Sequence, residues 1–340
     1  MDVFALTRAL VDIDSITPNE TVIGDWLYEY LEPLAARYDG EIERMEVAPG
    51  RDNIWVRWGR PEIVFSTHMD TVPPFIPSRE DDEHVWGRGA CDTHGICAAM
   101  IKASEALLEE GVRDFGILLV VGEEVDGLGA AFANERAPAE VRYLINGEPT
   151  SNQLALGSKG TLRLEIRASG KAAHSAYPEL GDSAIEKLLD NLESLRRVDW
   201  PTDPVLGPST LNIGVMRGGE AANIVPDRAE ASVVIRVVSD LAALKKLAFD
   251  ALDERVEVQV TTETPAVRLE AVDSFATCVV KYTTDIPKLT QWGRPLLLGP
   301  GTIHVAHTRE ERIAKQELTD AIGLYQRLVK RLKQEASIKA

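Results

Sequence analysis

The sequence is poor in cysteine and in basic residues, and each shortage excludes a class of protein. Cys91, Cys97 and Cys278 are an odd number in a 340-residue chain and lack the paired spacing of a zinc ribbon or redox motif, which excludes a small disulfide scaffold. Lysine and arginine number 37 against 54 aspartates and glutamates, so the formal net charge is -17 at pH 7. Such a charge repels phosphate backbones and anionic lipids, and we expect neither nucleic acid nor a membrane as a partner.

Long hydrophobic runs are also missing, and we expect no secretory leader. No apolar stretch approaches the ~20 residues of a membrane-spanning helix, and MDVFALTRALVDID at the N-terminus has acids where a signal peptide has basic residues. Hydrophobic residues make up 44% of the chain and charged residues 27%, which is ordinary globular usage. We expect a cytoplasmic protein that folds over most of its length, with about two domains.

Residues 1–157 alternate between helical and extended patterns. The apolar spacing predicts helices over 19–37 and 96–108, and strands over 41–47, 53–58, 62–67, 116–121 and 142–146. Continuous apolar runs such as ILLVV are typical of strands buried in a parallel sheet that helices cover. These residues therefore predict an α/β domain.

From residue 158 the pattern changes to β-α-β-β-α-β, which is typical of a ferredoxin-like α+β domain. The predicted strands cover 161–169, 209–217, 229–237 and 256–262, and the helices cover 181–196 and 240–253. After Pro265 the chain returns to an α/β pattern and ends in a helix predicted over 310–333, with 336–340 expected to fray. We therefore expect one α/β domain, residues 1–157 and 266–340, interrupted by a domain of residues 158–265.

Polar side chains follow the predicted strands of the α/β domain, where open parallel sheets bind their ligands. His68 and Asp70 follow VFST, Glu123 and Glu124 follow ILLVVG, Glu148 follows YLING, and Asp92 lies in the loop GRGACDTHG directly before a helix. All of these side chains supply nitrogen or oxygen ligands for metals. Four such clusters at one edge of one sheet indicate a metal site.

Each cluster alone has an ordinary explanation. A His-x-Asp pair is commonly a surface pair, although in an extended segment Asp70 can accept the ring N–H of His68 and orient the other nitrogen outward. Adjacent acids are commonly a solvated turn. Glu123 and Glu124, however, follow a buried strand, where two carboxylates repel each other unless a cation or a shared proton compensates them.

A fifth cluster lies in LLLGPGTIHVAHTREE. It is either an ordinary loop with two half-exposed histidines, or a loop in which His304 or His307 completes a two-metal set. Gly299 and Gly301 would let the backbone approach a ligand closely, which makes Gly301 a candidate for substrate binding.

Seven blocks, in order along nearly the whole chain, resemble one known family. The blocks are THMDTVPP, WGRGACDTHG, GEEVDGLGA, NGEPT, GKAAHSAYPELGDSA, NIGVMRGGEAANIVPDRAEASVVIR and GPGTIHVAHTREE. The chain is similar to the dizinc amidohydrolases and exopeptidases that include acetylornithine deacetylase, succinyl-diaminopimelate desuccinylase and the glutamate carboxypeptidases. The resemblance implies a zinc-exopeptidase-like catalytic domain with a mostly parallel central sheet, interrupted by a ferredoxin-like lid and dimerisation domain.

The resemblance also implies a role for each clustered residue. His68 and Glu148 would bind one Zn²⁺, Glu124 and His307 the other, and Asp92 both, with Co²⁺ or Mn²⁺ as substitutes. Glu123 would be the general base, and Asp70, which would orient His68, is counted with it among the catalytic residues. His307 matches the family position and His304 does not, because His307 heads a His-Thr-x-x-Glu pattern that ends at Glu311. The peptide bond after Asp92 is cis in the family.

Three further roles fall on the inserted domain. His174 resembles a histidine that reaches the active site of a partner subunit, which implies a homodimer, and Asn223 and Arg236 match positions that grip the substrate carboxylate. The chain departs from the family at His94, followed by Gly95 and Ile96. His94 could adjust the surroundings of the metal ligands, contact a metal, or simply cap the following helix.

The sequence thus predicts a metal-dependent hydrolase that cleaves the amide bond of a small N-acyl-amino acid, in the manner of acetylornithine deacetylase or succinyl-diaminopimelate desuccinylase. The attacking water would be shared by both ions as a bridging hydroxide. A dipeptidase or carboxypeptidase of the same family is the alternative, because peptide and N-acyl bonds are both amides. A non-catalytic metal-binding homologue predicts loss of the base or of a ligand, and the sequence retains both.

Overall fold

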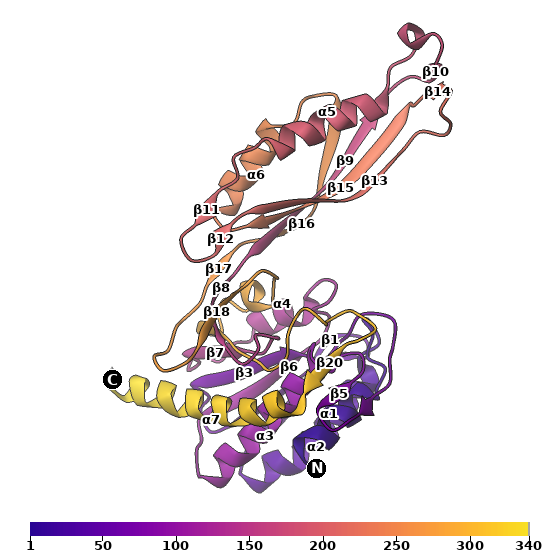
Figure 1. Ribbon diagram of the computed structural model, residues 1–340. Coiled ribbons are helices and arrows are strands. Elements are labelled where there is room, and N and C mark those ends of the chain that lie inside the picture. The colour runs from indigo at the N-terminus through magenta and orange to yellow at the C-terminus, as the bar shows by residue number, and fades with distance from the viewer. Residues whose placement is uncertain (339–340) are drawn as a thin grey trace. The chain divides into compact units, whose positions relative to one another are not determined.

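The computed structural model describes residues 1–338 and divides into two compact units. The first unit comprises residues 1–156, 269–278 and 284 onward, and the second comprises residues 157–268 and 279–283. Residues 339 and 340, part of the stretch expected to fray, lie outside the described residues. One ferredoxin-like unit is therefore inserted into an α/β unit, and the predicted fold class is confirmed (Figure 1).

A six-stranded mixed sheet forms the centre of the first unit. Its order is β1 (Glu41–Ala48), β2 (Arg51–Trp58), β6 (Phe115–Val120), β3 (Ile63–His68), β7 (Tyr143–Asn146) and β19 (Arg294–Leu297). The last four of these strands run parallel, whereas β1 and β2 are antiparallel at one edge. Every residue of β3, β6 and β7 is buried, which explains their unbroken apolar runs.

Helices cover both faces of this sheet. The helices α1 (Val3–Val11), α2 (Thr21–Arg37), α3 (His94–Glu109) and α7 (Lys315–Ile338) pack on one face, and α4 (Leu128–Asn134) packs on the other (Figure 1). Alternate strand residues divide between the two cores: Phe65 and Ile117 face α3, whereas Val64 and Leu118 face α4. Within residues 1–338, no helix combines the length and the apolar character needed to cross a bilayer.

The end of the chain differs from its sequence prediction. The last helix begins at Lys315, five residues later than predicted, because β20 (Arg312–Ala314) pairs with β5 (His84–Trp86), which pairs in turn with β4 (Arg79–Glu80). Ile313 is buried by this pairing. An apolar residue at that position suits a strand and a helix equally, so the local pattern could not separate them.

The second unit has the predicted β-α-β-β-α-β order. Its elements are β9 (Gly160–Ser169), α5 (Ala184–Arg196), β13 (Thr210–Gly218), β15 (Arg228–Val237), α6 (Leu241–Asp250) and β16 (Val256–Thr264). The antiparallel sheet has the order β13-β15-β9-β16, and α5 and α6 pack on one face (Figure 1). Helix α5 begins at Ala184, later than predicted, because the Ser183 hydroxyl accepts the N–H of Glu186 and caps it there.

Short elements complete the chain. They are β8 (Leu154–Ser158), β10 (Ala173–His174), β11 (Thr202–Asp203), β12 (Gly207–Pro208), β14 (Ile224–Val225), β17 (Val267–Arg268), β18 (Thr277–Val280) and the 3-10 helices η1 (Pro178–Leu180) and η2 (Ile286–Lys288). Strand β10 pairs with β14, which sets His174 opposite Ile224.

Candidate metal centre

Acids and a histidine follow three neighbouring strands of the first unit. His68 is the last residue of β3, and Glu148 lies two residues beyond β7. Glu123 and Glu124 follow β6 after a turn at Gly122, whose φ of 78° favours glycine. Because β6, β3 and β7 are adjacent and parallel, their carboxyl ends bring these side chains to one edge of the sheet.

Asp92 lies between the two histidines of the predicted ligand set. Its Oδ1 is 3.1 Å from Nε2 of His68, and its Oδ2 is 3.3 Å from Nε2 of His307. Each histidine also faces a second acid: Oε1 of Glu148 lies 4.0 Å from His68 Nε2, and Oε1 of Glu124 lies 3.0 Å from His307 Nε2. The structure therefore brings all five predicted ligands together, in two groups that share one carboxylate.

The electrostatics of both histidines suit a bound cation. Hydrogen bonds with Asp92 and Glu124 raise the pKa of His307 to about 10. Burial alone would lower the pKa of His68, but its interactions with Asp70 and Asp92 raise it well above the usual value. Positive charge is thus strongly favoured where the two rings meet Asp92, and these nitrogen and oxygen donors are ones that divalent zinc, cobalt and manganese accept.

Burial governs the carboxylates around the cluster. It raises the pKa of Glu123 and Glu148 well above the usual range, and it raises the pKa of Glu124 as well. Asp92 behaves oppositely: burial would raise its pKa, but hydrogen bonds with His307 and His68 lower it. Asp92 is therefore the carboxylate that stays ionised between the histidines, and Glu123 is one that can hold a proton.

Asp70 positions the loop that carries the two glutamates. Its buried carboxylate accepts hydrogen bonds from the backbone N–H of Glu123 at 3.1 Å, from that of Glu124 at 3.2 Å, and from the Thr17 hydroxyl at 2.6 Å. Nδ1 of His68 lies 3.0 Å from the carbonyl oxygen of Asp70 and 3.6 Å from its carboxylate. The sequence predicts that the Asp70 carboxylate accepts the ring N–H of His68 because both residues lie in one extended segment. In the structure β3 ends at His68, so Asp70 lies beyond the strand.

The loop after β19 supplies His307 and not His304. His307 has a φ of 62° and a half-exposed side chain that reaches Asp92 and Glu124. His304 is exposed, and its backbone N–H donates to the Thr302 hydroxyl. Gly301 has a φ of 84°, and a Cβ there would lie 2.9 Å from Cβ of Cys91. The absence of a side chain at Gly301 therefore lets this loop approach the loop that carries Asp92. The contact of Gly301 with substrate stays a prediction.

The position where the chain departs from the family, His94, is the first residue of α3 and is buried. Its Nε2 lies 3.1 Å from the carbonyl oxygen of Met69, the residue between His68 and Asp70. Because a carbonyl only accepts, Nε2 carries the ring proton, and burial lowers the pKa of His94 to about 4, so the ring is neutral. His94 therefore ties the end of β3 to the start of α3.

This contact predicts opposite results for two substitutions of His94. His94→Gln keeps an N–H donor for Met69 and should retain stability and metal content, whereas His94→Leu leaves that buried carbonyl unpaired and should cost about 1–3 kcal/mol. Urea unfolding and metal analysis of both variants measure this. A folded His94→Gln protein that binds one metal ion fewer than wild type would make His94 a ligand instead.

Asp285 is a buried acid near this cluster that the sequence reasoning missed. It directly precedes η2 and is 3% exposed. Burial raises the pKa of Asp285 to about 7, and the charge of Asp70 adds to this shift while that of His68 opposes it. In the segment KYTTDIPKL, a lone aspartate before Ile-Pro looks like an ordinary turn residue, so no local signal marked it.

The three remaining predicted residues lie in the second unit. His174 is exposed in β10, with Nδ1 accepting the N–H of Ala176 at 3.1 Å, and the carbonyl of Asn223 accepts the N–H of Ser175. Arg236 is half-buried in β15, and its guanidinium donates to the Thr161 hydroxyl at 2.7 Å. Within this unit the structure thus sets His174 on β10, Asn223 in the turn directly before β14, the strand that pairs with β10, and Arg236 on the main sheet.

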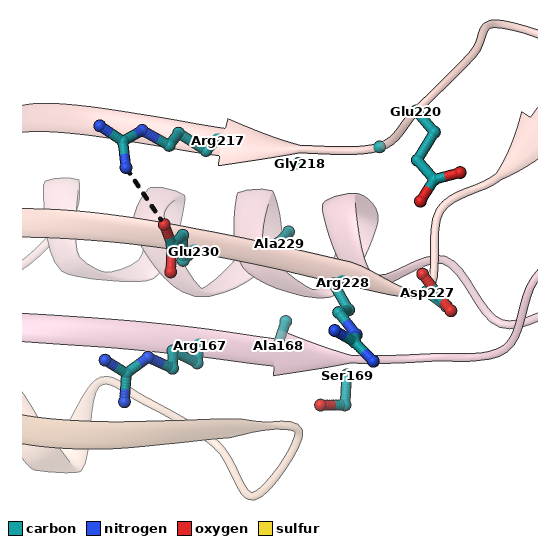
Figure 2. A pocket seen from close by; sticks show the side chains of 11 residues that line it. Arg167, Ala168, Ser169, Arg217, Gly218, Glu220, Asp227, Arg228, Ala229 and Glu230 are labelled. Carbon is teal, nitrogen blue, oxygen red and sulfur yellow. Dashed lines mark ion pairs between the residues drawn. The ribbon is translucent and has the colours of Figure 1, made fainter.

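A hollow of about 520 Å³ also lies on the second unit, at one end of β9, β13 and β15 (Figure 2). Its charged lining residues are Arg167, Arg217, Arg228, Glu220, Asp227 and Glu230, and Arg217 pairs with Glu230. Three positive and three negative charges balance one another there. The hollow contains none of the predicted site residues, and its balanced charge selects no class of ligand.

Comparison with known proteins gives one family model and related sequences. Residues 156–267 match the model described as a peptidase dimerisation domain. A Schizosaccharomyces pombe protein named as peptidase M20 domain-containing is 38% identical to this chain, over 96% of the chain and 84% of that protein. A probable carboxypeptidase of Talaromyces marneffei is 37% identical, with the same two shares covered.

Solved structures share the fold. A tripeptidase from Staphylococcus aureus superposes with a TM-score of 0.81, covering 95% of this chain and 96% of that one, at 22% identity. At that identity the likeness shows the fold alone. The sequence relatives, which are more than 30% identical across nearly the whole chain, carry the assignment to a family.

Proposed function

Because this chain belongs to the M20 peptidase family, we propose that it is a dinuclear metal-dependent exopeptidase that cleaves the amide bond next to a free carboxylate in a small peptide. The family consists of hydrolases acting on amide bonds, as the sequence predicts. The observation that carries the proposal is Asp92, whose two carboxylate oxygens face Nε2 of two different histidines, each with its own second acid.

The proposed ligands follow from these distances. His68 and Glu148 would hold one ion, Glu124 and His307 would hold the other, and Asp92 would contribute to both, with Zn²⁺ as the first candidate and Co²⁺ or Mn²⁺ as substitutes. Two such ions, when bound, polarise the scissile carbonyl and lower the pKa of the attacking water. His68 and Asp92 are buried, so little bulk water can compete with their side chains for a metal ion.

Glu123 is the proposed general base. Its backbone is fixed by Asp70, and burial raises its pKa, so the carboxyl group can accept a proton from water and return it to the leaving amine. Glu124, one residue on, points to His307 instead. In this proposal Glu124 binds metal and Glu123 transfers the proton.

Residues of the second unit would bind the substrate carboxylate. Arg236 is a half-buried cation whose guanidinium is oriented by Thr161, and Asn223 supplies a further polar contact. His174 would stabilise the developing oxyanion in the partner subunit. These three roles follow from the family resemblance.

Hydrolysis of an N-acyl-amino acid is the second candidate. The sequence placed an acetylornithine-type deacetylase or a desuccinylase first. The related sequences named as probable carboxypeptidases favour the peptide bond at least as well, and Arg236 suits the carboxylate of either substrate. We therefore place peptidase activity first.

A mixed panel of dipeptides, tripeptides, N-acetyl-amino acids and N-succinyl-amino acids tests the proposal. Mass spectrometry of the products, with zinc-loaded protein and a chelated control, should show metal-dependent release of a C-terminal amino acid. Release from N-acyl substrates alone would favour the deacylase. If two ions are bound and no substrate of the panel is hydrolysed, both the peptidase and the deacylase proposals are contradicted. That result would favour a non-catalytic metal-binding homologue.

Substitution of Arg236 tests the binding of the carboxylate. Arg236→Gln should raise KM for a substrate with a free carboxylate by roughly 10- to 100-fold, because a charged hydrogen bond contributes about 1.5–3 kcal/mol. The C-terminal amide of the same substrate should be affected little. Arg197→Gln, which removes an arginine that directly follows α5 of the same unit and whose side chain is 77% exposed, is the matched control. Equal KM changes for acid and amide would contradict the role.

The free edge of the second unit's sheet supports a homodimer. Strand β13 lies at one edge of the sheet and exposes the side chains of Val215 and Met216, which are 44% and 55% accessible. Exposed apolar edge strands pair readily with another strand. Sedimentation should give twice the chain mass for wild type and a monomer for Val215→Lys/Met216→Lys. A fully active wild-type monomer would contradict a site completed by His174 of a partner.

A further inference from the structure

A buried ion pair between Arg88 and Glu311 lies beside the candidate metal centre, and the proposed mechanism leaves it without a role. The Arg88 side chain is 2% exposed and that of Glu311 is fully buried, with Nη1 bonded to Oε2. Burying two opposite charges gives little net stability unless their other hydrogen-bonding atoms are also satisfied. The remaining contacts of this pair therefore show what it holds.

Glu311 holds the loop of the bridging aspartate. Its Oε1 accepts the backbone N–H of Gly89 at 2.9 Å and that of Asp92 itself at 3.3 Å, while its own carbonyl accepts the N–H of Gly87. Gly89 has a φ of 84°, a backbone conformation that would be strained in most residues other than glycine. The carboxylate of Glu311 thus fixes the backbone from which the Asp92 side chain projects.

Arg88 links this loop to two others. Its Nε donates to the carbonyl of Pro74 at 3.3 Å, in the segment that follows β3 and His68. Its Nη1 donates to the carbonyl of Thr308 at 3.4 Å, directly after His307. The planar guanidinium can hold several acceptors in fixed directions at once, which a lysine cannot do.

We propose that the Arg88–Glu311 pair is a positioning device that sets the carboxylate of Asp92 against His307 and so orients two of the residues that would hold the metal ions. The inference rests on the proposed dinuclear function. Each of the three loops that meet at the pair carries or directly follows a ligand: His68, Asp92 or His307. Groups that orient metal ligands typically change metal affinity by 10- to 100-fold when they are removed.

The two ions should respond differently to loss of the pair. Asp92 and His307 both depend on contacts with Arg88 or Glu311, whereas Glu148 follows β7 on a separate segment. The ion proposed for Asp92, Glu124 and His307 should therefore weaken more, because two of its ligands depend on the pair. The ion proposed for His68, Asp92 and Glu148 depends on the pair through Asp92 alone. A pair that only stabilised the fold would lower the unfolding temperature and leave the affinities of both ions unchanged.

Metal titration of the full-length protein separates these cases. Apo protein is titrated with Zn²⁺ by calorimetry, and with Co²⁺ by absorption, for wild type, Glu311→Gln and Arg88→Lys, with the thermal midpoint of each. We expect two ions in wild type and, in Glu311→Gln, a 10- to 100-fold weaker second ion with the first within a few-fold of wild type. Arg88→Lys keeps the positive charge but loses the planar guanidinium with its several donors. It should therefore weaken the second ion by a smaller factor.

Trp292→Phe is the control for general destabilisation. Trp292 is buried in the same unit, and its Nε1 donates to the carbonyl of Ala133 at 3.1 Å, on the α4 side of the sheet. It should lower the thermal midpoint and keep both affinities.

Four outcomes would overturn an assignment. Wild-type affinities in both Glu311→Gln and Arg88→Lys, or an equal weakening in Trp292→Phe, would overturn the positioning role. If Glu311→Gln does not fold, Arg88→Lys decides alone. Wild-type binding of fewer than two ions would overturn the dinuclear proposal and this inference with it, whereas two bound ions without hydrolysis would overturn the proposed function only.

Discussion

Replacing Glu123 with glutamine should lower kcat by about 10²- to 10⁴-fold, the usual contribution of general acid–base catalysis, and leave both metal sites filled. Glutamine keeps the size of the side chain but cannot accept the proton of the attacking water. Glu123 does not bond to either histidine, and its backbone is held by Asp70, so its loss should disturb the ligands little. Steady-state kinetics on the best substrate, together with metal analysis, measure both parts.

Glu135→Gln provides the matched control for this substitution. Glu135 directly follows α4, and its side chain is 79% exposed, so the same chemical change there should leave kcat unchanged. Glu123→Ala should be as inactive as Glu123→Gln. If the alanine variant kept more than a tenth of the wild-type kcat, another group would have to move the proton.

Most of the candidate centre is predictable because its residues follow recognisable strands. His68, Glu124 and Glu148 each come just after a buried apolar run, and parallel strands carry their carboxyl ends to one edge. Asp92 is predictable from its place before a helix. The choice of His307 over His304 came from the family resemblance, since both lie on the same loop and local pattern treats them alike.

The residues that the sequence did not reveal act through contacts between distant segments. The pKa of Asp285 is raised to about 7 because folding buries the carboxyl group and places it near the charge of Asp70. Thr17, which donates to Asp70, lies 53 residues away along the chain. Such contacts depend on how loops pack, and neither spacing nor hydrophobic periodicity encodes loop packing.

Helix α1 and strand β20 were missed for a related reason. Helix α1 is short, and Asp2 caps it by accepting the N–H of Ala5, while burial of Leu6 and Leu10 against the core holds it in place. Strand β20 exists only through its pairing with β5, more than 200 residues earlier. Both elements owe their stability to tertiary contacts rather than to local propensity.

Removing the metal ions should abolish hydrolysis and make the stability of the protein fall as pH rises. Burial raises the pKa of Glu123 and Glu148 in the folded protein, and burial also raises that of Asp285 to about 7, so after chelation these groups bind more protons folded than unfolded. The pKa of His307, raised to about 10 by Asp92 and Glu124, acts in the same direction above pH 6.5. Stability linked to these groups is present at low pH and is lost as pH rises from about 5 to 9.

Bound ions should reverse most of this dependence, because a divalent cation on the same nitrogen and oxygen atoms replaces the protons. Each ion at a free concentration 100-fold above its Kd adds about 2.7 kcal/mol to the free energy of unfolding, and its affinity grows as the ligands lose their protons. Calorimetric thermal midpoints between pH 5 and 9, with chelator and with Zn²⁺, should therefore diverge as pH rises. Thermal midpoints of the chelated protein that rise with pH across this window would mean that the folded cluster does not hold extra protons. Midpoints that stay parallel with and without Zn²⁺ would mean that ions and protons do not compete for Asp92, His68 and His307.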